Sequence, residues 1–166
     1  MAAGQTFWFA DYLKRVMAGE ALPDMGTTPN TIKCALIKSA ANGGFDPEVT
    51  TDYPTWGATG DNDLSAAEVT AGGTYTAGGN VCASPSATRA AASPLVAVDW
   101  ANPTSWAQDG ANPSNARWAI FYDDTTPDNM CIAWMDLGQD QDMTTGELQL
   151  NMADPTGLQI LCEVPA

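Results

Sequence analysis

The side chains that could carry out chemistry are mostly carboxylates, and six aspartates gather in two stretches, residues 123–128 and 136–142. They are Asp123, Asp124, Asp128, Asp136, Asp140 and Asp142. Paired carboxylates can hydrolyse glycosides, and clustered oxygen ligands can bind calcium. The segment Asp140–Glu147 alternates oxygen ligands, but its glycine and its final Glu do not have the spacing of an EF-hand loop. We therefore interpret the aspartates as a solvated acidic rim, and we predict no catalytic and no metal-binding residues.

The sequence contains no histidine. This removes the most common general base, the usual zinc ligand set and every Ser–His or Cys–His nucleophile. The glycine-rich run from Gly72 to Gly79 has no Lys followed by Ser or Thr, and it does not match a dinucleotide fingerprint. Tight turns flanking a short strand explain this run better. We expect a protein that is not an enzyme and that holds no cofactor.

The four cysteines, Cys34, Cys82, Cys131 and Cys162, lie far apart in the sequence. All except Cys82 occupy alternating apolar positions of expected strands, which is typical of buried small hydrophobic residues. A disulfide is not required, since nothing at the N-terminus resembles a secretory signal, but the sequence leaves this pairing open. Arg117 is the one cation within the central apolar run, and we expect it to pair with a neighbouring carboxylate.

The charge balance is strongly acidic, with six Lys and Arg against twenty Asp and Glu and a formal net charge of −14. This charge opposes binding to nucleic acid or to an anionic membrane surface and favours a positively charged partner. The six cations are too scattered to form a phosphate-binding stripe. No segment approaches the length of a membrane span. We therefore predict no nucleic-acid partner and no membrane association.

The elements that must position these residues are centred on Asn115–Gly138. This stretch contains two apolar runs, Ala116–Tyr122 and Met130–Met135, separated by Asp, Thr, Pro and Asn. Continuous apolar runs predict strands that are covered on both faces. We expect a second sheet on one face and a helix or a partner subunit on the other.

The N-terminal region has helical periodicity from Phe7 to Met17, with Lys14 and Arg15 opposite the apolar positions. Thr6 is the expected N-cap and Gly19 the expected C-cap. We expect this helix to pack on the sheet rather than to act as an exposed docking helix.

Further strands are predicted from alternating or β-branched runs, and a short helix at Asp63–Val69 from the capping-box spacing of Ser65 and Glu68. The strands are expected at residues 31–37, 80–83, 95–100, 147–152 and 158–164, with residues 84–94 as a link. Asp154–Gly157 should form the hairpin turn between the last two. The chain is therefore expected to be all-β, a β-sandwich with jelly-roll or Greek-key connections, one short N-terminal helix and long loops. We expect one domain, with residues 1–30 as helix and connector and 31–166 as sandwich.

Five short segments occur in one order in this sequence. They are TIKCALIKS (Thr31–Ser39), EVTAGGTYTAGGN (Glu68–Asn80), VDWANPTSW (Val98–Trp106), ARWAIFYDDT (Ala116–Thr125) and IAWMDLGQDQ (Ile132–Gln141). This series resembles small virion structural proteins of tailed bacteriophages, the group that includes capsid decoration or cement proteins. The resemblance covers most of the chain from Thr31 onward and carries over no catalytic residues.

The resemblance implies a jelly-roll-like protein that is made in the cytoplasm of a host bacterium and sits on the outer surface of the capsid. It would bind the major capsid protein and tie neighbouring subunits together, as a homo-oligomer that is a dimer or a trimer. The alternatives are a neck, tail or fibre-base virion protein and a carbohydrate-binding β-sandwich.

Two polar loops, residues 42–62 and 102–114, are the candidate contact surfaces. They carry Tyr53, Trp56 and Trp106, and aromatic anchors are common at protein interfaces. The alternative for Tyr53 and Trp56 is that they fasten their loop to the body of the protein.

Overall fold

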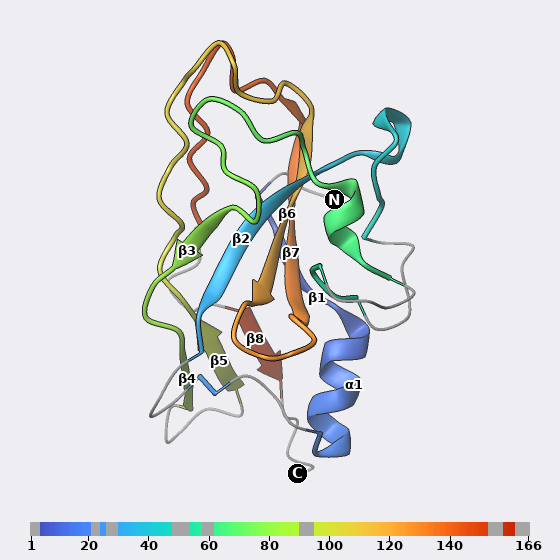
Figure 1. Ribbon diagram of the computed structural model, residues 1–166. Helices are drawn as coiled ribbons and strands as arrows, with labels where there is room; N and C mark the ends of the chain where they lie inside the picture. The colour runs from blue at the N-terminus through green and yellow to red at the C-terminus, as the bar shows by residue number, and fades with distance from the viewer. Residues whose placement is uncertain are drawn as a thin grey trace.

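The computed structural model describes residues 4–20, 24–25, 30–47, 54–57, 62–89, 95–152 and 158–161. Within these residues the protein is mostly β, with two antiparallel sheets and one short α-helix (Figure 1). The larger sheet has the order β1 (Thr6–Trp8), β7 (Cys131–Gln141), β6 (Ala116–Asp123), β2 (Ile32–Lys38), β3 (Asn80–Cys82). The smaller sheet has the order β4 (Ser86–Arg89), β5 (Leu95–Asp99), β8 (Leu158–Leu161).

The centre of the larger sheet is the pair β6 and β7, so the two predicted central strands are confirmed. Ile120 on β6 lies opposite Trp134 on β7 and opposite Ala35 on β2. All three side chains are buried, and burial is continuous along most of β6 and the first half of β7. The unbroken apolar runs therefore correspond to strands whose two faces are both buried.

Strand β7 continues past its predicted end at Met135 as far as Gln141. Ala116 is paired with Gln141, whereas Trp118, only two residues later, is paired with Asp136. The extra residues of β7 between these two pairs form a bulge. Apart from Leu137 they are polar or glycine, so the apolar pattern gave no indication that the strand continues through them.

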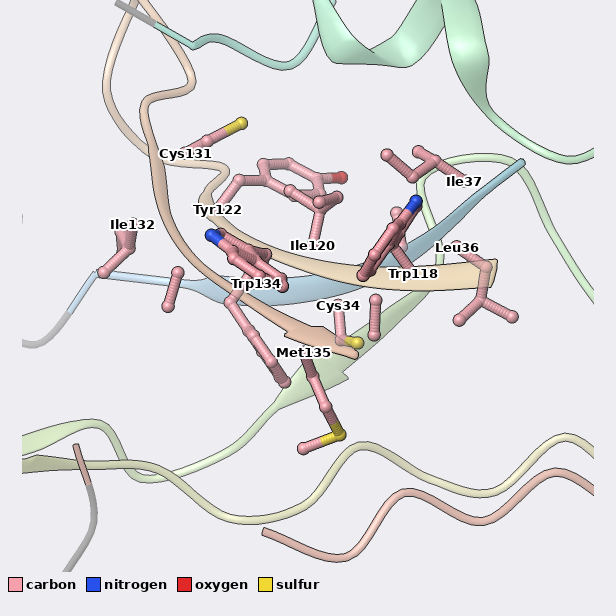
Figure 2. Close-up of a cluster of buried hydrophobic side chains, with 14 of the residues drawn as sticks. Cys34, Leu36, Ile37, Trp118, Ile120, Tyr122, Cys131, Ile132, Trp134 and Met135 are labelled. Carbon is pink, nitrogen blue, oxygen red and sulfur yellow. The ribbon is translucent and has the colours of Figure 1, made fainter. Parts of the chain in front are cut away.

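Both faces of the central strands are covered by this chain. Figure 2 shows Trp118, Trp134 and Tyr122 on one side of the sheet and Cys34 and Met135 on the other. The first side is covered in part by a loop whose Trp56 ring stacks on Tyr122, with 5.0 Å between ring centroids. A loop of the same chain thus supplies cover where a helix or a partner subunit was expected.

The opposite face meets the end of the smaller sheet. Trp100, which follows β5, lies against Phe121 of β6 with ring centroids 5.3 Å apart. Val98 of β5 is buried in the same hydrophobic core. Residues that belong to or border both sheets therefore contribute to one core.

The N-terminal helix α1 (Ala10–Ala18) begins later than predicted, because residues 6–8 form strand β1 on the edge of β7. Thr6 is consequently not the N-cap: it is paired with Met135, and the helix begins after Phe9. Gly19 is confirmed as the C-cap, with φ of 72° and its N–H directed at the last turn of the helix. Tyr12 is buried and stacks on Trp8, so the helix packs against the body as expected.

Some of the remaining strand predictions are confirmed and others are wrong. β2, β3 and β5 are confirmed, whereas β4 lies inside the stretch that was expected to be a link. Residues 147–152 show the predicted alternation of burial but form no strand, and only Leu148 makes an isolated bridge, to Trp106. β8 pairs with β5, so the predicted final hairpin is wrong. The expected turn at residues 154–157 lies outside the described residues.

Two local predictions change in detail. The helical segment before Val69 is a 3-10 helix, η2 (Leu64–Ala67), and Asp63 caps it by accepting from the Ser65 amide at 2.9 Å. The glycine-rich run forms turns without the short strand expected inside it. Gly79, with φ of 69°, brings the backbone so close to β2 that an added Cβ would lie 1.9 Å from the Cys34 carbonyl oxygen.

Within the described residues, no helix is long and apolar enough to cross a membrane.

Candidate functional site

The three predicted contact residues are not gathered on a surface. Tyr53 lies outside the described residues. Trp56 and Trp106 are buried, with 6% and 1% of their surface exposed. A direct contact between these two rings and a partner does not fit this structure, because the core of the chain already covers both. For Trp56 this burial fits the alternative, in which the ring fastens its loop to the body, and Trp106 is buried in the same way.

Trp56 attaches its loop to the start of β7. The backbone N–H of Trp56 donates to the Asn129 carbonyl, and the Asn129 side-chain amide donates to the Trp56 carbonyl, both at 2.9 Å. Two residues earlier, the Pro54 carbonyl accepts from the Cys131 amide at 3.0 Å. These backbone bonds and the stack on Tyr122 hold this part of the loop against the sheet.

Trp106 attaches the second loop to the segment that follows β7. Trp106 and Leu148 exchange two backbone hydrogen bonds of 3.0 Å. The Trp106 ring lies against Tyr75, with 5.9 Å between centroids. Among the described residues, the buried indole N–H of Trp106 has no hydrogen-bond partner. Packing and backbone pairing, rather than the indole N–H, therefore hold Trp106 in place.

Asn112 joins three separate loops, and sequence reasoning missed it. Its side chain, 5% exposed, accepts from the amides of Thr74 at 2.8 Å and Tyr75 at 3.3 Å. It donates to the carbonyls of Ala107 at 2.8 Å and Met143 at 3.1 Å. The signal in the sequence is weak, since an Asn before Pro in a polar loop is equally consistent with an exposed turn.

A second set of hydrogen-bonded polar side chains, Glu68 and Tyr75, holds the glycine-rich turns. Glu68 accepts from the Tyr75 hydroxyl at 2.8 Å and from the Gly78 amide at 2.6 Å. The Tyr75 hydroxyl also accepts from the Leu36 amide of β2 at 3.0 Å. Burial, followed by the charge of Glu68, raises the pKa of Tyr75, so the phenol stays protonated and donates. These hydrogen bonds hold the turns to β2.

The prediction of a solvated acidic rim is wrong for Asp123 in the first acidic stretch. Asp123 is fully buried and accepts from the Asn30 side chain at 2.8 Å and from the Thr125 amide at 2.9 Å. Asp124 forms an ion pair with Lys33 of β2 at 2.8 Å. These two neighbouring carboxylates thus have separate structural partners.

The second stretch contains the ion pair predicted for Arg117. Its partner is Asp136, which is 4% exposed, and the Gly138 amide donates to the same carboxylate oxygen at 2.6 Å. The guanidinium also lies over the Trp118 ring, 4.0 Å from its centroid. Burial alone would raise the pKa of Asp136, but the bond to Arg117, the Gly138 amide and the Arg117 charge together lower it.

The described residues contain no group of three or more His, Cys, Asp or Glu side chains that could hold a metal ion. Asp142, at the end of the second stretch, instead accepts from the amide and the hydroxyl of Thr144 at 2.9 and 2.6 Å. These hydrogen bonds lower the pKa of Asp142. The carboxylate therefore shapes a turn.

The three cysteines that the structure describes, Cys34, Cys82 and Cys131, are free and buried. Burial raises the pKa of all three thiols, to about 12 for Cys82, so they stay protonated and unreactive near neutral pH. Cys34 and Cys82 lie diagonally across β2 and β3, where Cα atoms are typically about 7–8 Å apart, too far for a disulfide. Cys162 lies outside the described residues.

Among the described residues, the contacts above fasten loops to the larger sheet and leave other polar side chains on the surface. In comparisons with protein-family models, with curated proteins and with solved structures, the chain matches none of them.

Proposed function

We propose that the protein is a non-enzymatic structural component of a tailed-bacteriophage virion, which binds the outer capsid surface and cements neighbouring subunits of the major capsid protein. The resemblance of its strand and turn segments to small virion proteins is the source of this proposal. The structure supports it through one observation, the fixation of three loops into a single surface.

We call this surface the loop end and define it as residues 72–76, 102–114 and 142–148. Figure 1 shows these segments together at the top of the molecule, away from α1. Buried side chains hold them from below, and the residues between these anchors, including Thr74, Gln108 and Glu147, are exposed. The anchors are Tyr75, Trp106, Asn112, Met143 and Leu148. A surface fixed in this way loses little conformational entropy on binding, which favours tight contacts.

We also propose that the two antiparallel sheets pack face to face as a jelly-roll-like β-sandwich, the shape that the resemblance implies. The contact of Trp100 with Phe121 and the shared core support this arrangement. In such a sandwich, loops gather at the ends of the sheets and can contact the curved surface of a shell.

The partner surface should be positively charged, because the chain carries a net charge of −14. We propose that the protein acts as a dimer or a trimer. Repeated weak contacts from each copy then add up to strong binding of the shell.

The first test is the copy number of this chain relative to the major capsid protein in purified particles, measured by quantitative mass spectrometry. A ratio near one, or a simple fraction of one, supports a protein that covers the shell. A ratio of a few per hundred would place the protein in the neck, tail or fibre base, and absence from the particle would overturn the proposal.

A second test places a new side chain on the loop end. A Cβ on Gly110 would meet no atom within 4 Å, so Gly110→Gln should leave the fold intact and obstruct the surface. Ala18→Gln places the same side chain at an exposed position of α1, at a distance from the loop end, and is the matched control. We expect Gly110→Gln to weaken binding to capsids and Ala18→Gln to leave it unchanged. Equal binding by both variants would exclude the loop end as the contact surface.

A further inference from the structure

Asn42 is an unusual asparagine in this chain, because it is the only one that precedes a glycine. It ends the short 3-10 helix η1 (Ala40–Asn42), and its side chain is exposed. The side-chain amide donates to Asp140 in the bulge of β7 and to the Ser39 hydroxyl. A hydrogen bond from a neutral amide to a carboxylate thus connects η1 to β7.

We propose that Asn42 is a site of spontaneous deamidation, and that this reaction breaks the connection between η1 and β7. The Gly43 backbone nitrogen attacks the side-chain carbonyl carbon of Asn42 and loses its proton. A C–N bond to Gly43 forms, the bond to Nδ2 breaks, and ammonia leaves. Water then opens the resulting cyclic imide to give aspartate or isoaspartate. No oxidant, reductant or enzyme is required.

The residue that follows an asparagine controls this attack, because its side chain crowds the attacking nitrogen. Gly43 has no side chain, and its φ of 70° places it in a conformation that other residues rarely adopt. Asn102 and Asn112 precede prolines, which have no N–H to lose. The other asparagines precede residues that carry side chains. The Gly43 amide donates to the Ala40 carbonyl at 3.1 Å, so opening of η1 must precede the reaction.

Deamidation replaces the attraction between the Asn42 amide and the Asp140 carboxylate by repulsion. A carboxylate at position 42 has no N–H to donate, and it would face a second carboxylate at hydrogen-bonding distance. Like charges at this separation repel each other, and salt screens the repulsion only in part because the atoms are close. Isoaspartate adds a further distortion, because it lengthens the backbone where the Asn42 and Gly44 amides both donate to the Ser39 carbonyl.

Asn42 is also the first residue of the loop 42–62, which the sequence predicts as a contact surface but which is not part of the loop end. Deamidation would loosen the start of this loop, and any effect of that on capsid binding rests on the proposed function. The chemistry itself does not, so it can be tested on the isolated protein.

The test is to incubate the purified protein in mildly alkaline buffer and to map its peptides by mass spectrometry over time. We expect the mass change from NH₂ to OH to accumulate at Asn42, while Asn102 and Asn112 stay unmodified. Absence of the change at Asn42, or a faster change at another asparagine, would overturn the proposal.

The structural consequence is tested separately with Asn42→Asp and the double variant Asn42→Asp/Asp140→Asn. The double variant restores a neutral amide opposite a carboxylate with the two groups exchanged. We expect faster hydrogen exchange at the Gly44 and Phe45 amides in Asn42→Asp, and slower exchange again in the double variant. Unchanged exchange in Asn42→Asp, or no recovery in the double variant, would contradict a role for the Asp140 contact.

Discussion

Asn112 is the residue on which the loop end depends most directly, since its side chain bonds to backbone groups of three loops. Asn112→Ala would remove this partner from the carbonyls of Ala107 and Met143 and from the amides of Thr74 and Tyr75. Each unsatisfied buried group typically costs about 1–3 kcal/mol. We expect the variant to lose about 3 kcal/mol of unfolding free energy in urea denaturation.

Asn151→Ala is the matched control for this variant. Asn151 is exposed, and among the described residues its side chain has a single long hydrogen bond, with Asn102 at 3.4 Å. We expect a change within about 0.5 kcal/mol, as for other surface substitutions. Equal losses in the two variants would show that Asn112 does not hold the loops together.

The Asp136–Arg117 pair gives stability a defined pH dependence. The pKa of Asp136 is lower in the folded protein than the usual value of about 3.9, so unfolding takes up a proton. Its contribution to stability is complete above that value and is lost as the pH falls through the folded pKa. We expect the unfolding free energy to fall with pH below about 5, and Asp136→Asn to reduce this slope in urea denaturation.

Arg117→Met separates the effect of the pair from that of burial. Without Arg117, burial is the largest influence on Asp136 and favours its protonated form. We expect a loss of about 3 kcal/mol at pH 7, because a buried carboxylate has lost its cation. Part of this loss should be recovered as the pH falls toward 4, the reverse of the wild-type slope. A parallel pH dependence in the variant and the wild type would contradict the pairing.

Among the elements, the loop around Trp106 tests whether aromatic rings anchor loops through packing. The Trp106 ring is buried against Tyr75, and its N–H has no partner among the described residues. Trp106→Ala should cost about 3–5 kcal/mol, as is typical of a large buried side chain. Trp106→Phe keeps most of the packing and gives up no hydrogen bond, so it should retain most of the stability. Similar losses for both, measured by urea denaturation, would mean that the indole N–H matters.

The turn before β3 gives a prediction about the joining of strands. Gly79→Ala would place a methyl group against the Cys34 carbonyl and force a side chain into positive φ. Gly146→Ala is the control, because its Cβ would meet nothing within 4 Å and its φ is not positive. We expect Gly79→Ala to lose more than about 1 kcal/mol in urea denaturation and Gly146→Ala to change little. If both tolerated alanine, β2 and β3 would not depend on this close approach.

The elements that could be predicted from the sequence are those with continuous apolar runs, because such runs indicate burial. β2, β6 and the first half of β7 are buried on both faces, and their runs are apolar for that reason. β4 consists of small and polar residues, and it forms because β5 lies beside it. The pairing of β8 with β5 is likewise a contact between distant parts of the chain, which local patterns do not encode.

The candidate site was predictable only in part for a related reason. A lone arginine in an apolar strand needs a buried anion, so the Arg117 pair could be expected. An aromatic ring in a polar loop is equally consistent with an exposed contact and a buried anchor, and Trp56 and Trp106 proved to be anchors. The role of Asn112 depends on three loops meeting in space, which no local pattern encodes.

At the scale of the whole molecule, charge is divided unevenly along the chain. Residues 1–38 hold four cations and three carboxylates, whereas residues 39–166 hold two cations and seventeen carboxylates. The loop end contains Asp109, Asp142 and Glu147 and no Lys or Arg, and α1, with Lys14 and Arg15, lies away from it (Figure 1). The loop end is thus acidic and carries no cation, which suits the positively charged partner surface proposed above.

Electrostatic attraction should therefore govern how fast the protein binds. We expect the association rate with capsids, measured by surface plasmon resonance, to fall steeply as salt is raised from low to physiological ionic strength. The dissociation rate should change less, because packing of the preformed loops is less sensitive to salt. An association rate independent of salt would contradict steering by the acidic loops.

The distribution of lysines has a practical consequence. All three, Lys14, Lys33 and Lys38, belong to α1 or β2, and none lies at the loop end. Amine-reactive reagents will therefore attach dyes, biotin or a solid support only to this part of the molecule and to the N-terminal amine. Such labelling would leave the side chains of the loop end itself unmodified. Attachment through Lys14 on α1 would hold the loop end away from a support, whereas Lys38 pairs with Ala116 next to that surface.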